Sequence, residues 1–456
     1  MRVTVVPTEE LGDRSYVIDH DGWAIVIDPQ RDIDRWERIV DERGLRVAMV
    51  CETHRHNDYV TGGSALAKAL VAAYVVPSGE VFDHRDEAIV DGQQITVGDL
   101  TLRAIETPGH TLGHTAYVIS TPGSPDAVFT GGSLLYGNVG RTDLVSPAHT
   151  DELTRAQLRS VRRLAGELEP DTRIYPTHGF GSFCAAGPAT VVDLSTVGEE
   201  RVSNPALADV AETEFVTQLI AGLDDYPSYY RYIGDINRRG PAAADLRPPA
   251  RVSPLQLRER LRAGEWVVDL RPAAEFAGGH LAGTFNFPLG TSLATRLGWL
   301  APWGAPITLL APDTATVAEA VRMLARIGIE HPGALVAPDL PALAEAVDVA
   351  YRSYRRVRWE DLAAARGDGD LVLDVRTAGE HAEARIAGSL HIPLHHLADQ
   401  ADQLPRQPIW LHCQAGYRAA VAASMLDRLG FEVTLIEDDF DRAVELGLAE
   451  RAVTPV

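Results

Sequence analysis

The stretch Thr53-His54-Arg55-His56-Asn57-Asp58-Tyr59 follows an apolar run, residues 45–51, that reads as a buried strand. Two histidines stand one residue apart, and a carboxylate follows two residues later. Imidazole and carboxylate groups suit zinc, iron or manganese as ligands. The stretch therefore predicts a metal site on a loop at the end of a strand. The same residues would also fit a solvated polar loop, so the rest of the chain has to decide.

Length and composition indicate a multidomain globular protein. A chain of 456 residues corresponds to about three domains, and 45% hydrophobic with 23% charged residues is ordinary for a folded chain. The net charge of -22 argues against binding to nucleic acid or to an anionic membrane. The sequence shows no signal peptide, no apolar run near the ~18 residues of a membrane span, and too few cysteines for a disulfide scaffold. We therefore expect a soluble cytoplasmic protein with reduced thiols.

Strand and helix patterns alternate over the first 190 residues. Strands are expected at 16–19, 23–28, 45–51, 73–76, 100–106, 116–119 and 127–129, and helices at 32–43 and 64–70. This order predicts a layered α/β domain whose functional residues lie on loops at strand ends. Three more loops of this kind carry signals: Thr107-Pro108-Gly109-His110-Thr111-Leu112-Gly113-His114, Phe129-Thr130-Gly131-Gly132-Ser133 and Tyr175-Pro176-Thr177-His178-Gly179.

The four motifs together resemble the metallo-β-lactamase fold, in particular its branch of glyoxalase II and persulfide dioxygenases, over residues 1–190. The resemblance implies an αββα sandwich with metal at one edge of the sheets. It assigns His54, His56 and His110 to the first metal site. It assigns Asp58 and His178 to part of the second metal site.

Two positions depart from the pattern of that family. Tyr59 stands where the family has a histidine, and Gly132 stands where it has an aspartate that bridges two metals or binds a single iron. The remaining face of three histidines suits zinc with a bound water, or iron if water or Asp58 replaces the missing carboxylate. An aspartate introduced at Gly132 is expected to tighten iron binding. Cys184 follows shortly after His178 and is either a candidate accessory thiol or a small buried hydrophobe.

A domain boundary is expected near residue 245, because proline and glycine are dense around it. Beyond it the chain repeats itself. Val267-Val268-Asp269-Leu270-Arg271 matches Val372-Leu373-Asp374-Val375-Arg376, and Pro288-Leu289 matches Pro393-Leu394 at the same spacing. Each copy alternates short apolar strands with helices, which predicts two parallel sheets covered by helices.

The second copy carries a cysteine in the setting of a reactive thiol. A strand at 409–412 is followed by Cys413-Gln414-Ala415-Gly416-Tyr417-Arg418 and then by an alanine-rich helix. A cysteine placed there meets backbone N–H groups and the positive end of the helix dipole, which favours a thiolate nucleophile and stabilises a persulfide. The arginine closes the loop. An inert buried cysteine is the alternative.

This copy resembles the rhodanese sulfurtransferases over its whole length. The resemblance implies that Cys413 accepts sulfane sulfur as a persulfide, inside the loop of residues 414–417, with Arg418 as its second catalytic residue. Phosphatase-type loops of similar chemistry are wider, which makes a phosphatase the weaker alternative. In the first copy, Ala311 and Thr316 occupy the two matching positions, so we expect an inactive rhodanese-like domain.

The order of these parts resembles bacterial persulfide dioxygenase–rhodanese fusions. The fold expected is α/β multidomain: a metallo-β-lactamase αββα sandwich followed by two rhodanese-like parallel-sheet α/β domains. The boundaries expected are 1–190 for the sandwich, 191–250 for an extension and linker, 251–345 for the inactive copy and 350–456 for the active one.

The resemblance implies sulfane-sulfur metabolism, in which the first domain oxidises a low-molecular-weight persulfide to sulfite and Cys413 transfers sulfur. Two alternatives remain for the first domain: a zinc thioester hydrolase of glyoxalase II type, and a non-catalytic domain that binds persulfides or a partner protein. The cofactor expected is one metal ion, Fe(II) or Zn(II). The partners expected are a glutathione-, mycothiol- or CoA-like persulfide, thiosulfate or sulfite, and a second copy of the chain in a homo-oligomer, without nucleic acid or membrane.

Overall fold

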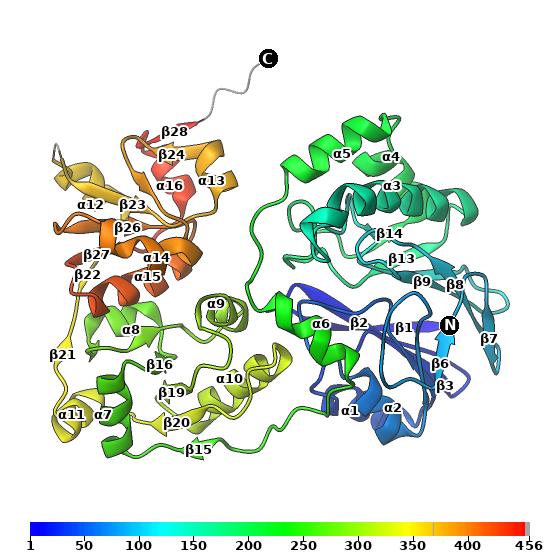
Figure 1. The fold of residues 1–456 in the computed structure, drawn as a ribbon, viewed down its shortest axis with the longest axis horizontal. Helices are drawn as coiled ribbons and strands as arrows, with labels where there is room; N and C mark the ends of the chain where they lie inside the picture. Colours follow the sequence, from blue (N-terminus) through cyan, green and yellow to red (C-terminus); the bar gives the residue numbers. More distant parts are fainter. Residues whose placement is uncertain (368, 452–456) are drawn as a thin grey trace. The chain divides into compact units, whose positions relative to one another are not determined.

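The computed structural model of the protein describes residues 1–367 and 369–451. These residues form two compact units. Unit 1 comprises Met1–Leu246 and Arg322–Gly328, and unit 2 comprises the rest of the described chain. Each unit contains its own sheets, which Figure 1 colours by position along the sequence.

Unit 1 contains two six-stranded sheets, with the orders β1-β2-β3-β4-β5-β6 and β14-β13-β10-β9-β8-β7. The first consists of β1 (Arg2–Thr8), β2 (Asp13–His20), β3 (Trp23–Ile27), β4 (Arg46–Cys51), β5 (Ala73–Pro77) and β6 (Glu87–Ile89). The second consists of β7 (Gln94–Val97), β8 (Leu100–Glu106), β9 (Thr115–Ser120), β10 (Ala127–Gly131), β13 (Arg173–Pro176) and β14 (Ser195–Thr196). A small hairpin joins β11 (Leu134–Leu135) to β12 (Asn138–Val139).

The helices of unit 1 complete a four-layer sandwich (Figure 1). They are α1 (Asp34–Arg43), α2 (Gly63–Leu70), α3 (Thr150–Glu167), α4 (Val197–Ser203), α5 (Glu212–Ala221) and α6 (Tyr230–Arg238). One apolar cluster joins α1 and α2 to one face of the first sheet, a second lies between the sheets, and a third joins α3 and α5 to the second sheet. The layers are therefore αββα, as the sequence predicted.

Local sequence explains where α1 stops. The helix ends at Gly44, which takes the left-handed conformation at φ 59°. Glycine has no Cβ to clash in that conformation, and the next amide, of Leu45, bonds back to the Val40 carbonyl. The chain then turns directly into β4, whose carboxyl end delivers the histidine motif.

Unit 2 contains two five-stranded parallel sheets with the same strand arrangement, β15-β20-β19-β16-β18 and β22-β27-β26-β23-β25. The first consists of β15 (Ala250–Arg251), β16 (Trp266–Asp269), β18 (Phe285–Asn286), β19 (Ile307–Ala311) and β20 (Gly333–Val336). The second consists of β22 (Arg355–Val357), β23 (Leu371–Asp374), β25 (Leu390–His391), β26 (Ile409–His412) and β27 (Val433–Ile436). Two further small sheets pair β17 (His280–Leu281) with β21 (Tyr351–Arg352), and β24 (Ala384–Ile386) with β28 (Ala449–Arg451). The shared order confirms the duplication that the sequence predicted.

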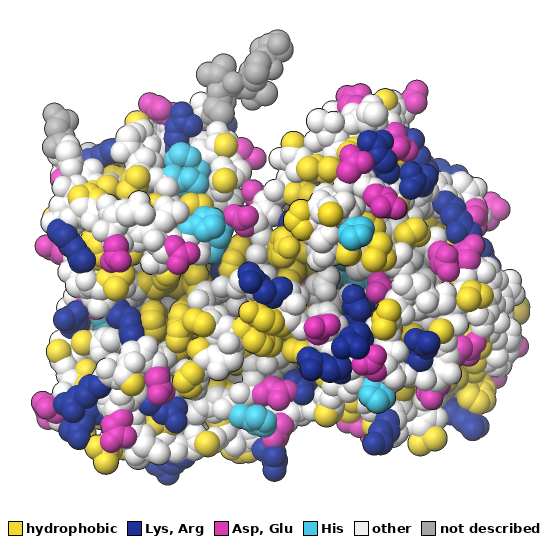
Figure 2. Space-filling view, in the orientation of Figure 1, with side chains coloured by type: hydrophobic (Ala, Val, Ile, Leu, Met, Phe, Trp, Pro, Cys, Tyr) yellow, Lys and Arg dark blue, Asp and Glu magenta, His cyan; other side chains and the backbone are white. Residues whose placement is uncertain are grey.

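Helices accompany both parallel sheets. Those after residue 247 are α7 (Pro254–Ala263), α8 (Ala273–Gly278), α9 (Leu293–Leu300), α10 (Thr314–Arg326), α11 (Leu340–Val347), α12 (Trp359–Ala365), α13 (Ala378–Glu383), α14 (Leu397–Gln400), α15 (Tyr417–Arg428) and α16 (Phe440–Glu445). None of the described helices combines the length and apolarity that crossing a membrane requires. Acidic and basic side chains are interspersed over the face drawn in Figure 2.

Candidate functional site

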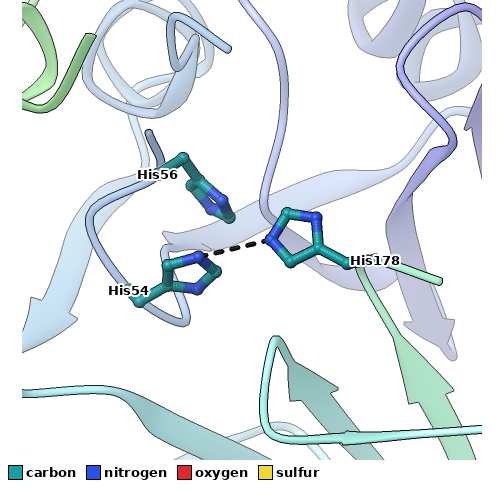
Figure 3. A group of neighbouring side chains, drawn as sticks. All are labelled: His54, His56 and His178. Atoms are coloured by element: carbon teal, nitrogen blue, oxygen red, sulfur yellow. Dashed lines mark hydrogen bonds between the residues drawn. The ribbon is translucent and has the colours of Figure 1, made fainter. Parts of the chain in front are cut away.

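Loops at the ends of strands from both sheets of unit 1 bring the predicted histidines together. His54 and His56 follow β4, His110 follows β8, and His178 follows β13. All four are at most 1% exposed. The rings of His54, His56 and His178 converge in Figure 3, and one ligand nitrogen from each lies within 4.8 Å of the others.

Hydrogen bonds fix the tautomer of His54. Thr53 Oγ1 donates its only hydrogen to Asp28 Oδ2 at 2.7 Å, so it accepts the bond that joins it to His54 Nδ1 at 2.9 Å. His54 therefore carries its hydrogen on Nδ1 and presents Nε2 as a bare lone pair. Burial and the neighbouring histidines hold the pKa of His54 well below its usual value, so the ring is neutral.

His110 and His114 lie close together in sequence but have different surroundings. His110 Nδ1 lies 2.7 Å from the carbonyl oxygen of Arg141, which only accepts, so His110 also presents a bare Nε2. His114 uses both nitrogens inside the protein: Nδ1 bonds Thr107 Oγ1 at 2.8 Å, and Nε2 accepts from the Gly132 N–H at 2.9 Å. His110 is therefore a ligand candidate, whereas His114 holds the backbone at Gly132.

His56 turns one nitrogen toward two carboxylates. Its Nε2 lies 3.2 Å from Asp28 Oδ1 and 3.4 Å from Glu52 Oε2. Burial lowers the pKa of His56, but the two carboxylates outweigh burial and raise this pKa to about 10. The second nitrogen, Nδ1, is buried and has no hydrogen-bond partner among the described residues.

His178 lies between the other histidines and a pair of carboxyl groups. Its Nδ1 is 2.8 Å from Asp13 Oδ1 and 3.4 Å from Asp58 Oδ2. Its Nε2 is 3.3 Å from His54 Nε2, the contact drawn as a dashed line in Figure 3. Burial raises the pKa of both Asp13 and Asp58 to about 7, because a buried carboxylate loses its hydration.

The two departures from the family pattern are both accommodated by packing. A Cβ on Gly132 would lie 2.2 Å from His110 Cδ2, so the His110 ring occupies the space that a side chain there would need. The Tyr59 ring stacks on His56 at 4.3 Å, and its hydroxyl donates to the Asp28 carbonyl oxygen at 3.2 Å. Tyr59 therefore behaves as a core residue beside the histidines.

Cys184 lies inside the same cluster. Its sulfur groups with one nitrogen each of His110 and His178, all within 4.8 Å of one another. The side chain is 0% exposed, and burial raises the pKa of the thiol well above its usual value. Cys184 therefore lies beside the histidines, as an accessory thiol would, and it is also fully buried, as a small core residue would be.

The donor set fits a divalent cation of the zinc or iron class. Imidazole nitrogens from three loops face one another, and none of the described groups partners His56 Nδ1. An unpartnered buried nitrogen is costly, and a divalent cation that displaces the proton of His56 would satisfy it. The predicted set of His54, His56 and His110 remains a prediction, and His178 stands beside it in the structure.

The cysteine loop of unit 2 lies between β26 and α15. Cys413 follows β26 directly and is 2% exposed. The Gly416 N–H donates to Cys413 Sγ at 3.2 Å, and the Gln414 carbonyl accepts from the Phe440 N–H at 2.8 Å. Gly416 adopts φ 95°, a conformation that favours glycine, just before α15 begins at Tyr417.

Arg418 and Glu380 close this loop with a two-point ion pair. Their nitrogen–oxygen distances are 2.5 and 2.6 Å. Burial raises the pKa of Glu380, but the guanidinium outweighs burial and brings this pKa to about 2. A cavity of about 410 Å³ lies beside the loop, lined in part by Glu380, Gln414 and Phe440.

The first copy repeats the frame without the thiol. Asp269 and Arg271 form the same ion pair, at 2.7 Å, that Asp374 and Arg376 form in the second copy. Ala311 ends β19 where Cys413 follows β26, and it is 2% exposed. The frame therefore exists without a nucleophile at that position.

Comparison with known proteins identifies the fold family. The metallo-beta-lactamase superfamily model matches residues 11–178, and the rhodanese-like domain model matches residues 359–444. The chain is 30% identical to the mitochondrial persulfide dioxygenase ETHE1 of Homo sapiens over 228 residues. The aligned region covers 50% of this chain and 77% of that protein. The chain belongs to the metallo-β-lactamase superfamily.

Other relatives of this metallo-β-lactamase superfamily chain carry different names. It is 33% identical over 171 residues to the hydroxyacylglutathione hydrolase of Cupriavidus metallidurans, covering 35% of the chain but only 61% of that enzyme. A crystal structure of a metallo-beta-lactamase from Staphylococcus aureus superposes with TM-score 0.67 at 25% identity, covering 74% of this chain and 98% of that one. The superfamily and rhodanese matches confirm the fold class that the sequence predicted.

Several residues of this metallo-β-lactamase site had no signal in the sequence. Asp13 opens β2 and meets His178 from the other sheet, a contact that spans 165 positions. Glu52 follows the strand expected at 45–51 and carried no prediction, yet its carboxylate lies 3.4 Å from His56 Nε2. Only Asp28, at the end of an apolar run and before a proline, had a local pattern that marked a strand end.

Proposed function

We propose that this protein acts in sulfane-sulfur metabolism, with Cys413 as the sulfur carrier of a rhodanese and the histidine cluster as a persulfide dioxygenase-like metal centre. The observation that carries the proposal is the loop at Cys413, with an N–H directed at its sulfur and the Arg418–Glu380 pair closing it. The rhodanese match over residues 359–444 supports the transfer step. Similarity to persulfide dioxygenase ETHE1 supports the oxidative step.

The transfer step uses two displacements at sulfur. The Cys413 thiolate attacks the outer sulfur of thiosulfate, the S–S bond of the donor breaks, and sulfite leaves with the electron pair. A thiolate or sulfite acceptor then attacks the outer sulfur of the Cys413 persulfide and releases the Cys413 thiolate. Backbone N–H groups of the loop stabilise the negative sulfur, as the Gly416 N–H does for Cys413 Sγ.

The oxidative step would use the histidine cluster of unit 1. The bare Nε2 atoms of His54 and His110, together with His56 Nδ1, are the predicted ligands of one metal ion. Fe(II), when bound, supplies the activation of O₂ that persulfide oxidation needs. The chain itself supplies a buried pocket that keeps His54 and His110 neutral and oriented, with Asp58 Oδ2 3.4 Å from His178 Nδ1.

A zinc thioester hydrolase is the second candidate, because the chain resembles hydroxyacylglutathione hydrolase. Tyr59 and Gly132 weaken this candidate, since neither side chain supplies a ligand for a second metal. Metal content separates the candidates: iron in the isolated protein favours the dioxygenase, and zinc favours the hydrolase. Little metal of either kind would favour a non-catalytic domain that binds persulfides for the sulfurtransferase.

The deciding experiment measures oxygen consumption by the iron-reconstituted full chain with glutathione persulfide. We expect oxygen uptake with formation of sulfite. Absence of uptake, with thiocyanate still formed from thiosulfate and cyanide, would reject the oxidative half and leave a sulfurtransferase. Hydrolysis of S-lactoylglutathione by the zinc-loaded chain would support the hydrolase instead.

The remaining predictions stay proposals about the whole protein. We propose a low-molecular-weight thiol persulfide and thiosulfate or sulfite as substrates, a homo-oligomeric state, and domain boundaries near residues 190, 250 and 350. We also propose a cytoplasmic location, because all three cysteines are free and buried, as in a reducing compartment. Size-exclusion chromatography with light scattering would test the oligomeric state, and a monomer would contradict it.

A further inference from the structure

The loop of the histidine motif links β4 to α2, and no helix or strand forms between Cys51 and Gly63. Tyr59, Val60 and Thr61 within it are at most 1% exposed. Their backbone N–H and C=O groups are cut off from water and need partners inside the protein. Because the loop has no regular structure of its own, the segments that supply those partners determine its path.

Asn237, in α6, supplies three of these partners with one side chain. Its Nδ2 donates to the carbonyl oxygens of His56 at 2.9 Å and of Tyr59 at 2.8 Å. Its Oδ1 accepts from the Thr61 N–H at 2.9 Å. The residue is 1% exposed, and both amide hydrogens and the amide oxygen are used on the loop. Asn237 therefore fixes the backbone of a predicted metal ligand, His56.

The end of α10 supplies a further partner. The Arg326 carbonyl oxygen accepts from the Val60 N–H at 2.7 Å. Arg322–Gly328 belong to unit 1, although α10 begins in unit 2, within the first copy of the duplicated domain. A piece of the copy that lacks the thiol is therefore built into the unit that carries the histidines.

Ion pairs anchor this end of α10 to the residues that begin α1. Arg326 Nη2 lies 2.5 Å from Asp32 Oδ2, and Arg326 also pairs with Glu10. Arg322 makes a two-point contact with Asp34, at 2.7 and 2.9 Å. Asp32 is 1% exposed, so the loss of Arg326 would leave a buried carboxylate without its partner. These contacts fix the position of the Arg326 carbonyl that holds Val60.

The two segments act on the backbone of one short stretch, His56 to Thr61. We propose that Asn237 and the end of α10 form a clamp that positions this loop, so that metal binding in unit 1 depends on the copy without a thiol. Metal ligands must be held within a fraction of an ångström, which a loop achieves only through such support. Asn237 and Arg326 are positioning residues, because they act through the loop. This inference rests on the proposed metal centre and adds that dependence to it.

The test measures two properties of the chelator-stripped full chain. One is hydrogen–deuterium exchange of the peptide that spans residues 54–62, and the other is Co²⁺ affinity, followed by visible absorption. In Arg326→Met we expect faster exchange at Val60 and a loss of about tenfold in Co²⁺ affinity, the lower end of what losing support around metal ligands costs. Asn237→Ala, which removes three bonds to the loop, should change both properties at least as much.

Two matched controls remove the same kinds of contact elsewhere. Arg271→Met breaks the ion pair with Asp269 in the first copy. Asn204→Ala removes a buried amide that donates to carbonyl oxygens of the β11–β12 hairpin. Neither should change the Co²⁺ affinity or the exchange of residues 54–62. Far-UV circular dichroism of every variant checks that it folds.

The outcomes separate the clamp from the metal centre itself. Absence of Co²⁺ binding by the unaltered chain would reject the centre and this inference with it. Faster exchange with unchanged affinity in Arg326→Met and Asn237→Ala would show contacts that only stabilise the fold, and would reject the clamp. Unchanged affinity in Arg326→Met alone would reject the role of α10. If Arg326→Met does not fold, Arg322→Gln, which loses only the partly exposed pair with Asp34, must change both properties in the same direction.

Discussion

Arg418 and Glu380 meet through two parallel nitrogen–oxygen contacts of 2.5 and 2.6 Å, between the first turn of α15 and the first turn of α13. The geometry is that of a guanidinium–carboxylate fork, which is stronger and more directional than a single contact. Glu380→Gln removes the charge and one acceptor, and leaves the guanidinium partly buried without its partner. We expect a loss of about 2 kcal/mol in unfolding free energy and at least a tenfold drop in sulfur transfer.

An exposed ion pair in the same unit provides the control for this prediction. Arg442 and Glu445 contact each other at 2.8 Å, but their side chains are 44% and 65% exposed. Glu445→Gln should leave the free energy of unfolding nearly unchanged, because water screens such exposed pairs. Urea unfolding and thiocyanate formation by both variants provide the comparison. Equal effects of the two substitutions would mean that the fork does not hold the loop.

Cys413→Ser should reduce thiocyanate formation from thiosulfate to the background rate. A hydroxyl at neutral pH is a far weaker nucleophile toward sulfur than a thiolate. Oxygen uptake by the iron-loaded chain should be unchanged at saturating persulfide, since the histidine cluster lies in unit 1. Cys51→Ala, which alters another buried thiol, should retain transfer. Transfer that survives in Cys413→Ser would show that another group carries the sulfur.

We expect burial of His412 to make the folded chain less stable in mild acid. It is 0% exposed in β26, burial lowers its pKa to about 4, and Asp374 at 3.8 Å opposes this shift only in part. The unfolded chain binds the proton near pH 6.5 and the folded chain only near pH 4. The contribution of the buried, neutral His412 to the free energy of unfolding is therefore complete above about pH 6.5. It decreases as the pH falls toward 4, and it amounts to on the order of 3 kcal/mol.

Replacement of the imidazole isolates this effect. His412→Leu keeps an apolar side chain of similar size beside Trp359, which contacts the His412 ring at 4.9 Å. Urea midpoints measured at pH 7.5, 6 and 5 should decrease more steeply for the unaltered chain than for the variant. Parallel pH profiles would show that other groups control acid unfolding.

The sequence predicted those parts of the protein whose signals are local. The strand expected at 409–412 is β26, and the run at 45–51 contains β4, because continuous apolar runs bounded by polar loops mark buried strands. The helix expected at 32–43 ends at Gly44 as its glycine indicates. By contrast, β6 and β7 were not predicted, because they are short strands with polar positions at sheet edges.

The candidate site divides in the same way. His54, His56 and His110 stood out because imidazoles within short motifs at strand ends are visible in sequence. Asp13 did not, because its role depends on β2 of one sheet meeting the loop after β13 of the other. Tertiary contacts between distant segments have no local sequence pattern, so only the folded chain reveals them.

Gly132→Asp is expected to weaken metal binding, the opposite of what the family pattern alone suggested. A Cβ at position 132 would lie 2.2 Å from His110 Cδ2, so any side chain there has to displace the His110 ring. The ring is held by its 2.7 Å bond to the Arg141 carbonyl, and moving it removes a predicted ligand. Gly132→Ala, which adds the Cβ without a carboxylate, should lower Co²⁺ affinity to a similar extent. Gly166→Ala in α3 meets none of the described atoms within 4 Å and should leave it unchanged. Tighter binding of Fe(II) or Co²⁺ by Gly132→Asp would show that His110 yields its place and that a carboxylate completes the centre.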